Sequence, residues 1–166
     1  MDVLKSCGKE KDLSTTTRIH VDIEEIISKD VYIGTALLSA YAKCGALEKA
    51  QEVFEKLSVR DTISWNALIS AYGLKGLHEK SLDCFKQMQE ENVNPNSVTY
   101  ICILKACTHV GSLSIVDDMN AEVRKQGLLA KDVALGNVLV DMYAKHGALK
   151  KAREVFEELP IRNVVS

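Results

Sequence analysis

The chain has 166 residues, of which 46% are hydrophobic and 27% are charged, a balance typical of a folded protein and not of a disordered or fibrous one. Its 21 Lys and Arg residues are balanced by 23 Asp and Glu residues, so no basic excess indicates a nucleic-acid partner. Only 2 Pro and 9 Gly interrupt a composition that favours helices over an all-β fold.

The cysteines and the N-terminus provide evidence about the cellular compartment of the protein. Five cysteines, an odd number without a close CxxC pair, argue against a disulfide framework or a zinc ribbon and favour a reducing compartment. The N-terminus has no apolar signal core, and no apolar run approaches the length of a membrane span, about 18 residues. We therefore expect no targeting segment in this chain and no membrane partner.

A repeated segment organises the rest of the sequence. Residues 41–57 recur as residues 143–159, with 13 of 17 positions identical at an offset of 102. Tyr72 and Phe85 lie between the two copies, with the same spacing as the Tyr and Phe of each copy. The period of 102 residues therefore subdivides into smaller related units.

The unit boundaries fall at the Asp or Asn residues that precede each new apolar segment. They give complete units of 31, 35, 36 and 31 residues, and the first three lengths sum to the offset of 102. In chain order the prediction is a partial unit 1–30, complete units 31–61, 62–96, 97–132 and 133–163, and the start of another at 164–166.

Each unit is predicted to form two helices around a Gly. In unit 31–61 two apolar stripes at 3.6-residue spacing flank the turn at Cys44 and Gly45. The stripes are Ile33, Ala36, Leu37, Ala40 and Tyr41, then Leu47, Ala50, Val53, Phe54 and Leu57. A plain helical bundle is the alternative, but a bundle has no need for such a period. We predict an all-α fold, a right-handed α-solenoid of helix-turn-helix repeats.

One unit carries a family resemblance. Residues 62–72, TISWNALISAY, followed by Gly76, Phe85, Met88 and the Asn-Pro-Asn at 94–96, resemble a standard 35-residue pentatricopeptide repeat (PPR). The Trp-x2-Leu-Gly-x2-Tyr pattern of tetratricopeptide repeats is absent. The alternating unit lengths resemble the long, short and standard repeats of the plant PLS subclass, in the order long (truncated), short, standard, long, short.

The resemblance implies sequence-specific binding of single-stranded RNA in a plastid or mitochondrion. It further implies a role in selecting cytidines for C-to-U editing, with editing-factor proteins as partners. In this family the fifth and the last residue of a repeat together read one base, and stacked hairpins can present one such site per repeat. The implied pairs are Thr35 with Asp61, Asn66 with Asn96, Ile101 with Asp132, and Asn137 with Asn163.

These pairs imply a core readout. The Thr–Asp pair resembles the combination for G, and the two Asn–Asn pairs resemble pyrimidine readers. Ile101 has no hydrogen-bonding group, so its position should tolerate any base. With the RNA running 5′ to 3′ along the chain, the readout is G, pyrimidine, any base, pyrimidine.

The resemblance also assigns contacts to the base faces and the phosphates. The second residues of the units, which would pack against the bases, are Tyr32, Ile63, Val98 and Ala134. Lys43 and Lys145 end the first helices, where a cation can approach the RNA backbone. Both sets have an ordinary alternative, as packing residues and as solvated lysines.

The proposed base readers have alternatives as well. Asp61, Asn96, Asp132 and Asn163 each precede a predicted helix, where Asp and Asn are favoured caps. Asn66 and Asn137 stand mid-helix, where an interhelical hydrogen bond would also explain an amide.

No enzyme, cofactor or metal is expected. The zinc deaminase signatures H-x-E and P-C-x-x-C are absent. Cys102, Cys107 and His109 form the nearest metal-like cluster, but the two cysteines would lie about 140° apart around a helix. The rival function is a protein-interaction scaffold. Apolar residues such as Val155 and Leu159, left uncovered at the chain end, predict end-to-end self-association.

Overall fold

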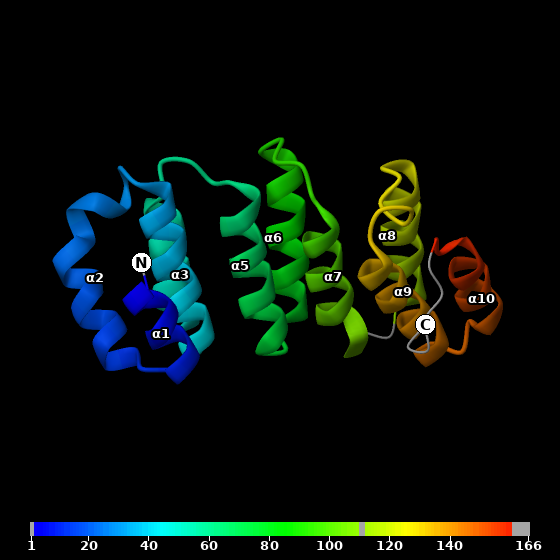
Figure 1. The fold of residues 1–166 in the computed structure, drawn as a ribbon, viewed down its shortest axis with the longest axis horizontal. Helices are drawn as coiled ribbons and strands as arrows, with labels where there is room; N and C mark the ends of the chain where they lie inside the picture. Colours follow the sequence, from blue (N-terminus) through cyan, green and yellow to red (C-terminus); the bar gives the residue numbers. More distant parts are fainter. Residues whose placement is uncertain (1, 110–111, 161–166) are drawn as a thin grey trace. The chain divides into compact units, whose positions relative to one another are not determined.

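The structure, a computed structural model, describes residues 2–109 and 112–160. Every regular element within these two ranges is a helix, so the predicted all-α fold is confirmed. The helices divide into two compact units, Met1–Asn94 and Pro95–Ser166 (Figure 1). In the described ranges no helix combines the length and the apolar composition needed to cross a bilayer.

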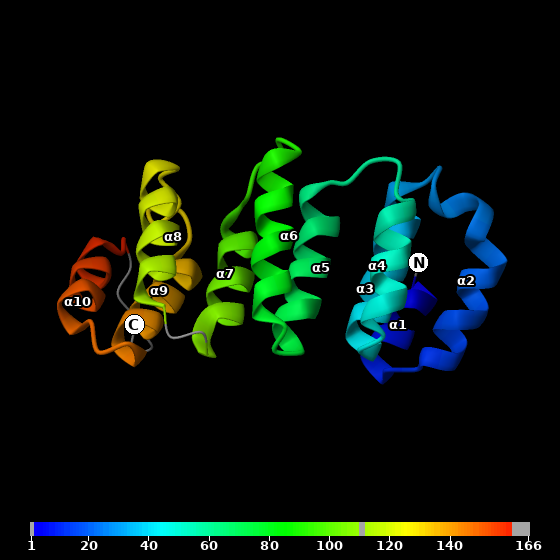
Figure 2. The ribbon, with the colours of Figure 1, turned by 180° about the vertical axis from the view of Figure 1, so that it is seen from behind.

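The first unit holds three helical hairpins. The first helices of successive hairpins form one layer, because α3 contacts both α1 and α5, and the second helices form another. Seen from behind, α4 lies over α3 (Figure 2). The helices are α1 (Asp2–Glu10), α2 (Leu13–Ile27), α3 (Val31–Cys44), α4 (Leu47–Lys56), α5 (Thr62–Leu74) and α6 (His78–Glu90).

The second unit repeats this arrangement with two hairpins. Helix α9 contacts α7 in the layer of first helices, and it also contacts α8 and α10 from the other layer. The elements are α7 (Ser97–Ala106), the 3-10 turn η1 (Cys107–His109), α8 (Leu113–Lys125), α9 (Val133–Lys145) and α10 (Leu149–Glu158). The boundaries of the repeat units themselves stay predictions.

The ends of the helices follow from local sequence. Helices α3, α5, α7 and α9 each begin after an Asp or Asn whose side chain accepts backbone N–H groups of the first turn. The turns of the hairpins α3–α4 and α9–α10 contain Gly45 and Gly147, with φ of 77° and 71°. Side chains with a Cβ rarely adopt this left-handed conformation, so Gly permits a sharp reversal into the second helix.

Both layers contribute to the core. Trp65 is completely buried, and its ring lies edge-on to Phe54 with the ring centroids 4.6 Å apart, which joins α5 to α4. The largest fully buried side chains are Ile27, Leu37, Leu38, Tyr41, Trp65, Ile69, Met88, Tyr100, Ile103, Leu104, Leu135 and Tyr143.

Candidate nucleic-acid interface

One cavity in the first unit brings together four of the base-reading and base-packing residues predicted from the sequence. Tyr32 and Thr35 come from α3, Asp61 precedes α5, and Ile63 lies in its first turn. The cavity has a volume of about 370 Å³. Its other lining residues are Leu4, Lys9, Ala36, Ser39, Ala40 and Lys43.

Thr35 is a buried polar residue on the α3 side of this cavity. The residue is only 8% exposed, and its Oγ1 has no hydrogen-bond partner among the described residues. A helical Thr commonly bonds a carbonyl of the preceding turn, and a buried hydroxyl without a partner costs free energy. The Thr35 hydroxyl can therefore still donate or accept a hydrogen bond at the cavity.

Asp61 lies across the cavity and also caps a helix. Its Oδ1 accepts a hydrogen bond of 2.8 Å from the backbone N–H of Ser64, in the first turn of α5. Helix capping, the alternative explanation for this residue, thus does occur. It engages one carboxylate oxygen, and a carboxylate offers about four acceptor sites. Capping and base contact are therefore compatible at this position.

The other described last-position residues cap helices too. Asp132 Oδ1 accepts from the N–H groups of Ala134 and Leu135 at 3.0 and 3.2 Å. Asn96 forms a capping box with Thr99, since Asn96 Oδ1 accepts from the Thr99 N–H and Thr99 Oγ1 accepts from the Asn96 N–H. Asn163 lies outside the described residues.

The two mid-helix asparagines are placed differently from Thr35. Asn66, in α5, is 9% exposed, and Asn137, in α9, is half-buried. Asn66 belongs to the first unit, whereas its expected partner Asn96 belongs to the second. Thr35 and Asp61 are an expected pair of described residues that line the same cavity.

The second-position residues are exposed in spite of their apolar character. Tyr32 is 75% exposed and Ile63 is 60% exposed, and they lie on the two helices that flank the cavity. In the second unit Val98 and Ala134 are exposed as well. Apolar side chains placed around a cavity are typical of a surface that accepts a planar apolar group.

Three lysines differ in their surroundings. Lys43 lines the cavity, and so does Lys9 from α1, which is not among the predicted phosphate contacts. Residues 3–7, VLKSC, resemble residues 103–107, ILKAC, at an offset of 100. This offset aligns Lys9 with His109, the counterpart of Lys43 in unit 97–132, and so could have revealed it. Lys145 donates to Asp141 at 2.6 Å, an i,i+4 pair that compensates its charge. Positive charge therefore gathers at the cavity of the first unit.

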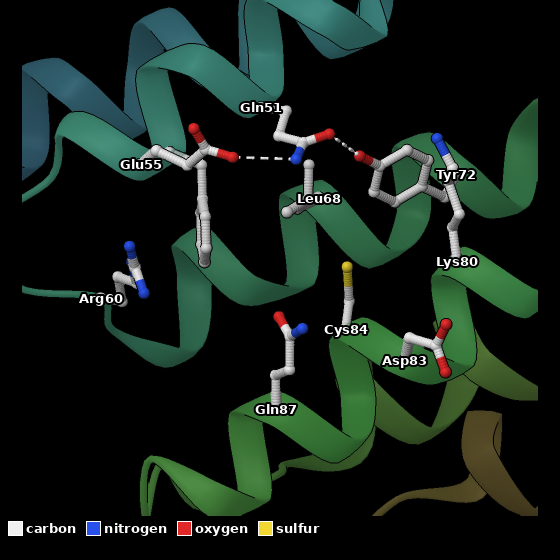
Figure 3. Close-up of a pocket in the computed structure, with 10 residues that line it drawn as sticks. Gln51, Glu55, Arg60, Leu68, Tyr72, Lys80, Asp83, Cys84 and Gln87 are labelled. Atoms are coloured by element: carbon white, nitrogen blue, oxygen red, sulfur yellow. Dashed lines mark hydrogen bonds between the residues drawn. The ribbon is translucent and has the colours of Figure 1, made fainter.

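A second cavity of about 400 Å³ lies between α4, α5 and α6 and contains none of the predicted site residues (Figure 3). Tyr72 OH donates to Gln51 Oε1 at 2.6 Å, and Gln51 Nε2 donates to Glu55 Oε1 at 2.9 Å. Burial raises the pKa of the Cys84 thiol to about 11, so it is a protonated thiol at neutral pH and a poor nucleophile. No group of three metal-ligating side chains occurs in the described part of the chain.

Comparison with known proteins places the chain among repeat proteins. The model of the PPR repeat family matches residues 60–109, and the PPR repeat model matches residues 35–61 and 137–164. The chain belongs to the pentatricopeptide repeat family. Thr35 and Asp61, the predicted reading residues, are the first and last residues of one matched segment.

Curated relatives in Arabidopsis thaliana cover nearly the whole chain. The chloroplastic pentatricopeptide repeat-containing protein At4g18520 is 34% identical over 99% of the chain, and the mitochondrial protein At3g09040 is 36% identical over 99%. The chain spans only 27% and 16% of the lengths of these two proteins.

Solved structures share the fold. The pentatricopeptide repeat protein PPR10, crystallised in complex with an 18-nt psaJ RNA element, matches 93% of the chain with a TM-score of 0.72 and 18% identity. The match spans 23% of the PPR10 chain. The helical-hairpin repeat architecture is thus that of a pentatricopeptide repeat protein.

Proposed function

We propose that the chain binds single-stranded RNA and reads one base with each complete repeat. The observation that carries this proposal is the cavity in which Tyr32, Thr35, Asp61 and Ile63 meet. Two exposed apolar side chains flank a buried hydroxyl and a carboxylate, which is the combination that a splayed-out base requires. Family membership and the RNA-bound state of PPR10 support the same function.

Chemistry favours guanine in this cavity. The Watson–Crick edge of guanine carries N–H donors beside a carbonyl acceptor. The Asp61 carboxylate can accept from the donors, while the Thr35 hydroxyl can donate or accept beside it. Tyr32 and Ile63 would pack on the two faces of the ring, and an aromatic contact of this kind contributes about 1–3 kcal/mol.

The remaining repeats extend the readout. Asn66 with Asn96 and Asn137 with Asn163 would each select a pyrimidine, and Ile101 with Asp132 would accept any base. The order along the RNA is then G, pyrimidine, any base, pyrimidine. Lys9 and Lys43 supply the phosphate contacts nearest the G cavity.

The cellular role follows from the subclass. We assign the chain to the PLS type, acting in a plastid or mitochondrion to select cytidines for C-to-U editing. The chloroplastic and mitochondrial names of its relatives support an organellar site. Partner proteins of the editing machinery would supply the deamination.

A binding titration tests the proposal. Short RNAs carrying the predicted core are compared with RNAs in which the G is replaced by A, C or U. We expect the G-containing RNA to bind best, and Thr35→Val to weaken it by about 1–3 kcal/mol while the other RNAs change little. Thr17→Val, on α2 and away from the cavity, is the matched control.

Two outcomes would contradict the proposal. Equal affinity for all four RNAs would remove base reading at this cavity. No detectable binding at low salt would favour the rival function, a scaffold for other proteins, which the balanced charge of the chain also allows. For binding RNA, two phosphate contacts should give a salt slope of about −1.4 on logarithmic axes.

A further inference from the structure

The position of Asp61 depends on the short loop between α4 and α5. The loop begins at Leu57, which is buried, and then passes through the exposed Ser58 and Val59. Asp61 follows Arg60 at its end. Because a carboxylate must be aimed to within a fraction of an ångström to accept selectively from one base, whatever holds this loop affects reading.

Arg60 fixes the loop through two contacts. Its guanidinium lies over the Phe54 ring, 4.9 Å from the centroid, and Nη1 donates to Glu91 Oε1 at 2.7 Å. The Arg60 side chain is 30% exposed and that of Glu91 is 40% exposed. Figure 3 shows Arg60 at one end of the cavity between α4, α5 and α6. A planar guanidinium that is stacked and paired has little freedom to reorient.

Thr62, which follows Asp61, is also held by the residues that follow α6. Thr62 Oγ1 donates to the backbone oxygen of Asn94 at 3.3 Å. Arg60 and Thr62 therefore both bond to residues 91–94, which follow α6 in the next hairpin. The reading carboxylate sits between two anchored neighbours.

The contact with Glu91 also determines where the positive charge of Arg60 lies. Arg60 is adjacent to Asp61, and a guanidinium released from Glu91 could pair with the Asp61 carboxylate and occupy its acceptor sites. In the structure Arg60 pairs with Glu91 instead. The Glu91 carboxylate thus keeps the Arg60 charge away from the reading group.

We infer that Arg60 and Glu91 are positioning residues for the Thr35–Asp61 cavity, so that the hairpin α5–α6 determines how strictly the preceding hairpin reads its base. The inference rests on the proposed function. It concerns the selectivity of one cavity, and it leaves the base-contacting residues themselves unchanged.

The chain offers a matched control pair. Lys56 donates to Glu24 at 2.7 Å and likewise joins neighbouring hairpins, with the two side chains 46% and 58% exposed. No predicted base reader adjoins Lys56 in the sequence. Breaking this pair perturbs an exposed ion pair of the same kind without touching the loop that carries Asp61.

The experiment measures a ratio of affinities. Unmodified protein, Arg60→Gln, Glu91→Gln and the control Lys56→Gln are titrated with RNAs carrying G or another base at the predicted position. We expect each of the first two variants to lower the preference for G by about tenfold, as a misaimed polar group does, while Lys56→Gln keeps it. The charge-swapped double variant Arg60→Glu with Glu91→Arg should regain part of the preference.

The outcomes separate this inference from the proposed function. A preference for G that persists in Arg60→Gln and Glu91→Gln, with helicity intact by circular dichroism, overturns the inference and leaves RNA reading in place. No preference in the unmodified protein overturns both. If Arg60→Gln alone loses helicity, Glu91→Gln decides, because it removes one exposed carboxylate from the end of α6.

Discussion

The hairpins α3–α4 and α9–α10 share a nearly identical segment but have different neighbours. Residues 41–57 and 143–159 are identical at 13 of 17 positions, and both hairpins turn at a left-handed Gly, with φ of 77° and 71°. Both also begin at an Asp that caps the second and third N–H groups of the helix. The shared residues therefore build the same hairpin twice.

The contacts that each hairpin makes with its predecessor differ. Tyr41 OH is joined to His20 Nδ1 on α2 by a hydrogen bond of 2.9 Å, whereas Tyr143 OH donates to Asp117 Oδ1 on α8 at 3.0 Å. Lys151 also pairs with Asp117, at 2.7 Å. The two equivalent tyrosines thus bond to an imidazole in the first unit and to the carboxylate of an ion pair in the second.

This comparison separates the residues that form a hairpin from the residues that join one hairpin to the next. The residues common to the two hairpins determine the helices and their turn. The residues facing them from α2 and α8 determine how one hairpin is held to the next. Four predictions test this division, beginning with the largest expected effect.

The first prediction concerns Leu57 and Leu159, which both hairpins share. Each lies against a Gly of the first helix, where an added Cβ would come within 2.3 Å of Leu57 at Gly34 and within 2.1 Å of Leu159 at Gly136. Both leucines are buried, and so is Val155, so the prediction that Val155 and Leu159 are left uncovered at the chain end is wrong. Leu57→Ala and Leu159→Ala should each lower the free energy of unfolding by about 2–5 kcal/mol, as measured by urea denaturation.

A double variant sharpens this first prediction. Gly34→Ala alone should destabilise the chain by crowding Leu57. In the Leu57→Ala background the closest clash is removed and only the contact of 3.2 Å with the Ile27 carbonyl oxygen remains, so the cost should be smaller. Equal costs of Gly34→Ala in the two backgrounds would show that the Gly–Leu contact does not set the hairpin geometry.

The second prediction contrasts the two tyrosines. Tyr143→Phe removes a donor to a charged carboxylate and should cost about 1–2 kcal/mol, while Tyr41→Phe removes a neutral hydrogen bond and should cost about 1 kcal/mol or less. Thermal unfolding of the two variants measures the difference. The opposite ranking would mean that the ion pair around Asp117 is not the tighter of the two links.

The third prediction concerns the caps of the two hairpins. Asp30→Ala and Asp132→Ala each remove the side chain that accepts two backbone N–H groups, and each should cost about 1 kcal/mol in thermal unfolding. Asp22→Ala, at an exposed position within α2, is the control and should change stability little. Unequal costs of the two cap variants would contradict the view that shared residues act alike.

The fourth and smallest effect depends on pH. Burial, followed by the charge of Lys56, lowers the pKa of His20 below its ordinary value of 6.5. The folded chain therefore resists protonation more than the unfolded chain, and the stabilisation is complete above pH 6.5 and is lost as the pH falls toward the folded pKa. Asp117 has a pKa lowered below 3.8, chiefly by the hydrogen bond from Lys151, so its link persists to a much lower pH.

Acidification should thus separate the two regions. Between pH 7 and pH 5 the backbone amides of α2 should exchange faster with solvent, after correction for intrinsic rates, while those of α8 should not. His20→Gln should abolish the difference at α2. Equal loosening of α8 would show that the two links do not differ in the way the side chains suggest.

The sequence predicted the helices of the hairpin α3–α4 well because their apolar pattern is local. The apolar stripe of 31–61 and its Gly turn identified both helices, and Leu37, Ala40 and Tyr41 are buried as expected. The periodicity missed Leu38, which is also fully buried, because α3 is flanked by α1, α2, α4 and α5 and so has more than one apolar face.

The site was predictable only in part. The family resemblance selected Thr35 and Asp61, and the structure places them on one cavity. Lys9 was missed because it belongs to the preceding hairpin, and the contact of Arg60 with Glu91 was missed because the two residues are far apart in sequence. Such contacts depend on how hairpins stack, which no local pattern records.

The proposed double role of Asp61, as helix cap and as base reader, has a consequence for changing the RNA specificity of the chain. A residue that must start a helix can be exchanged for Asn or Ser at little cost to the fold, because these are equally good caps, whereas Ala would cost about 1 kcal/mol. The residue types that suit this position are therefore few, polar and already compatible with folding. A single substitution there can be used to change base specificity without redesigning the rest of the fold.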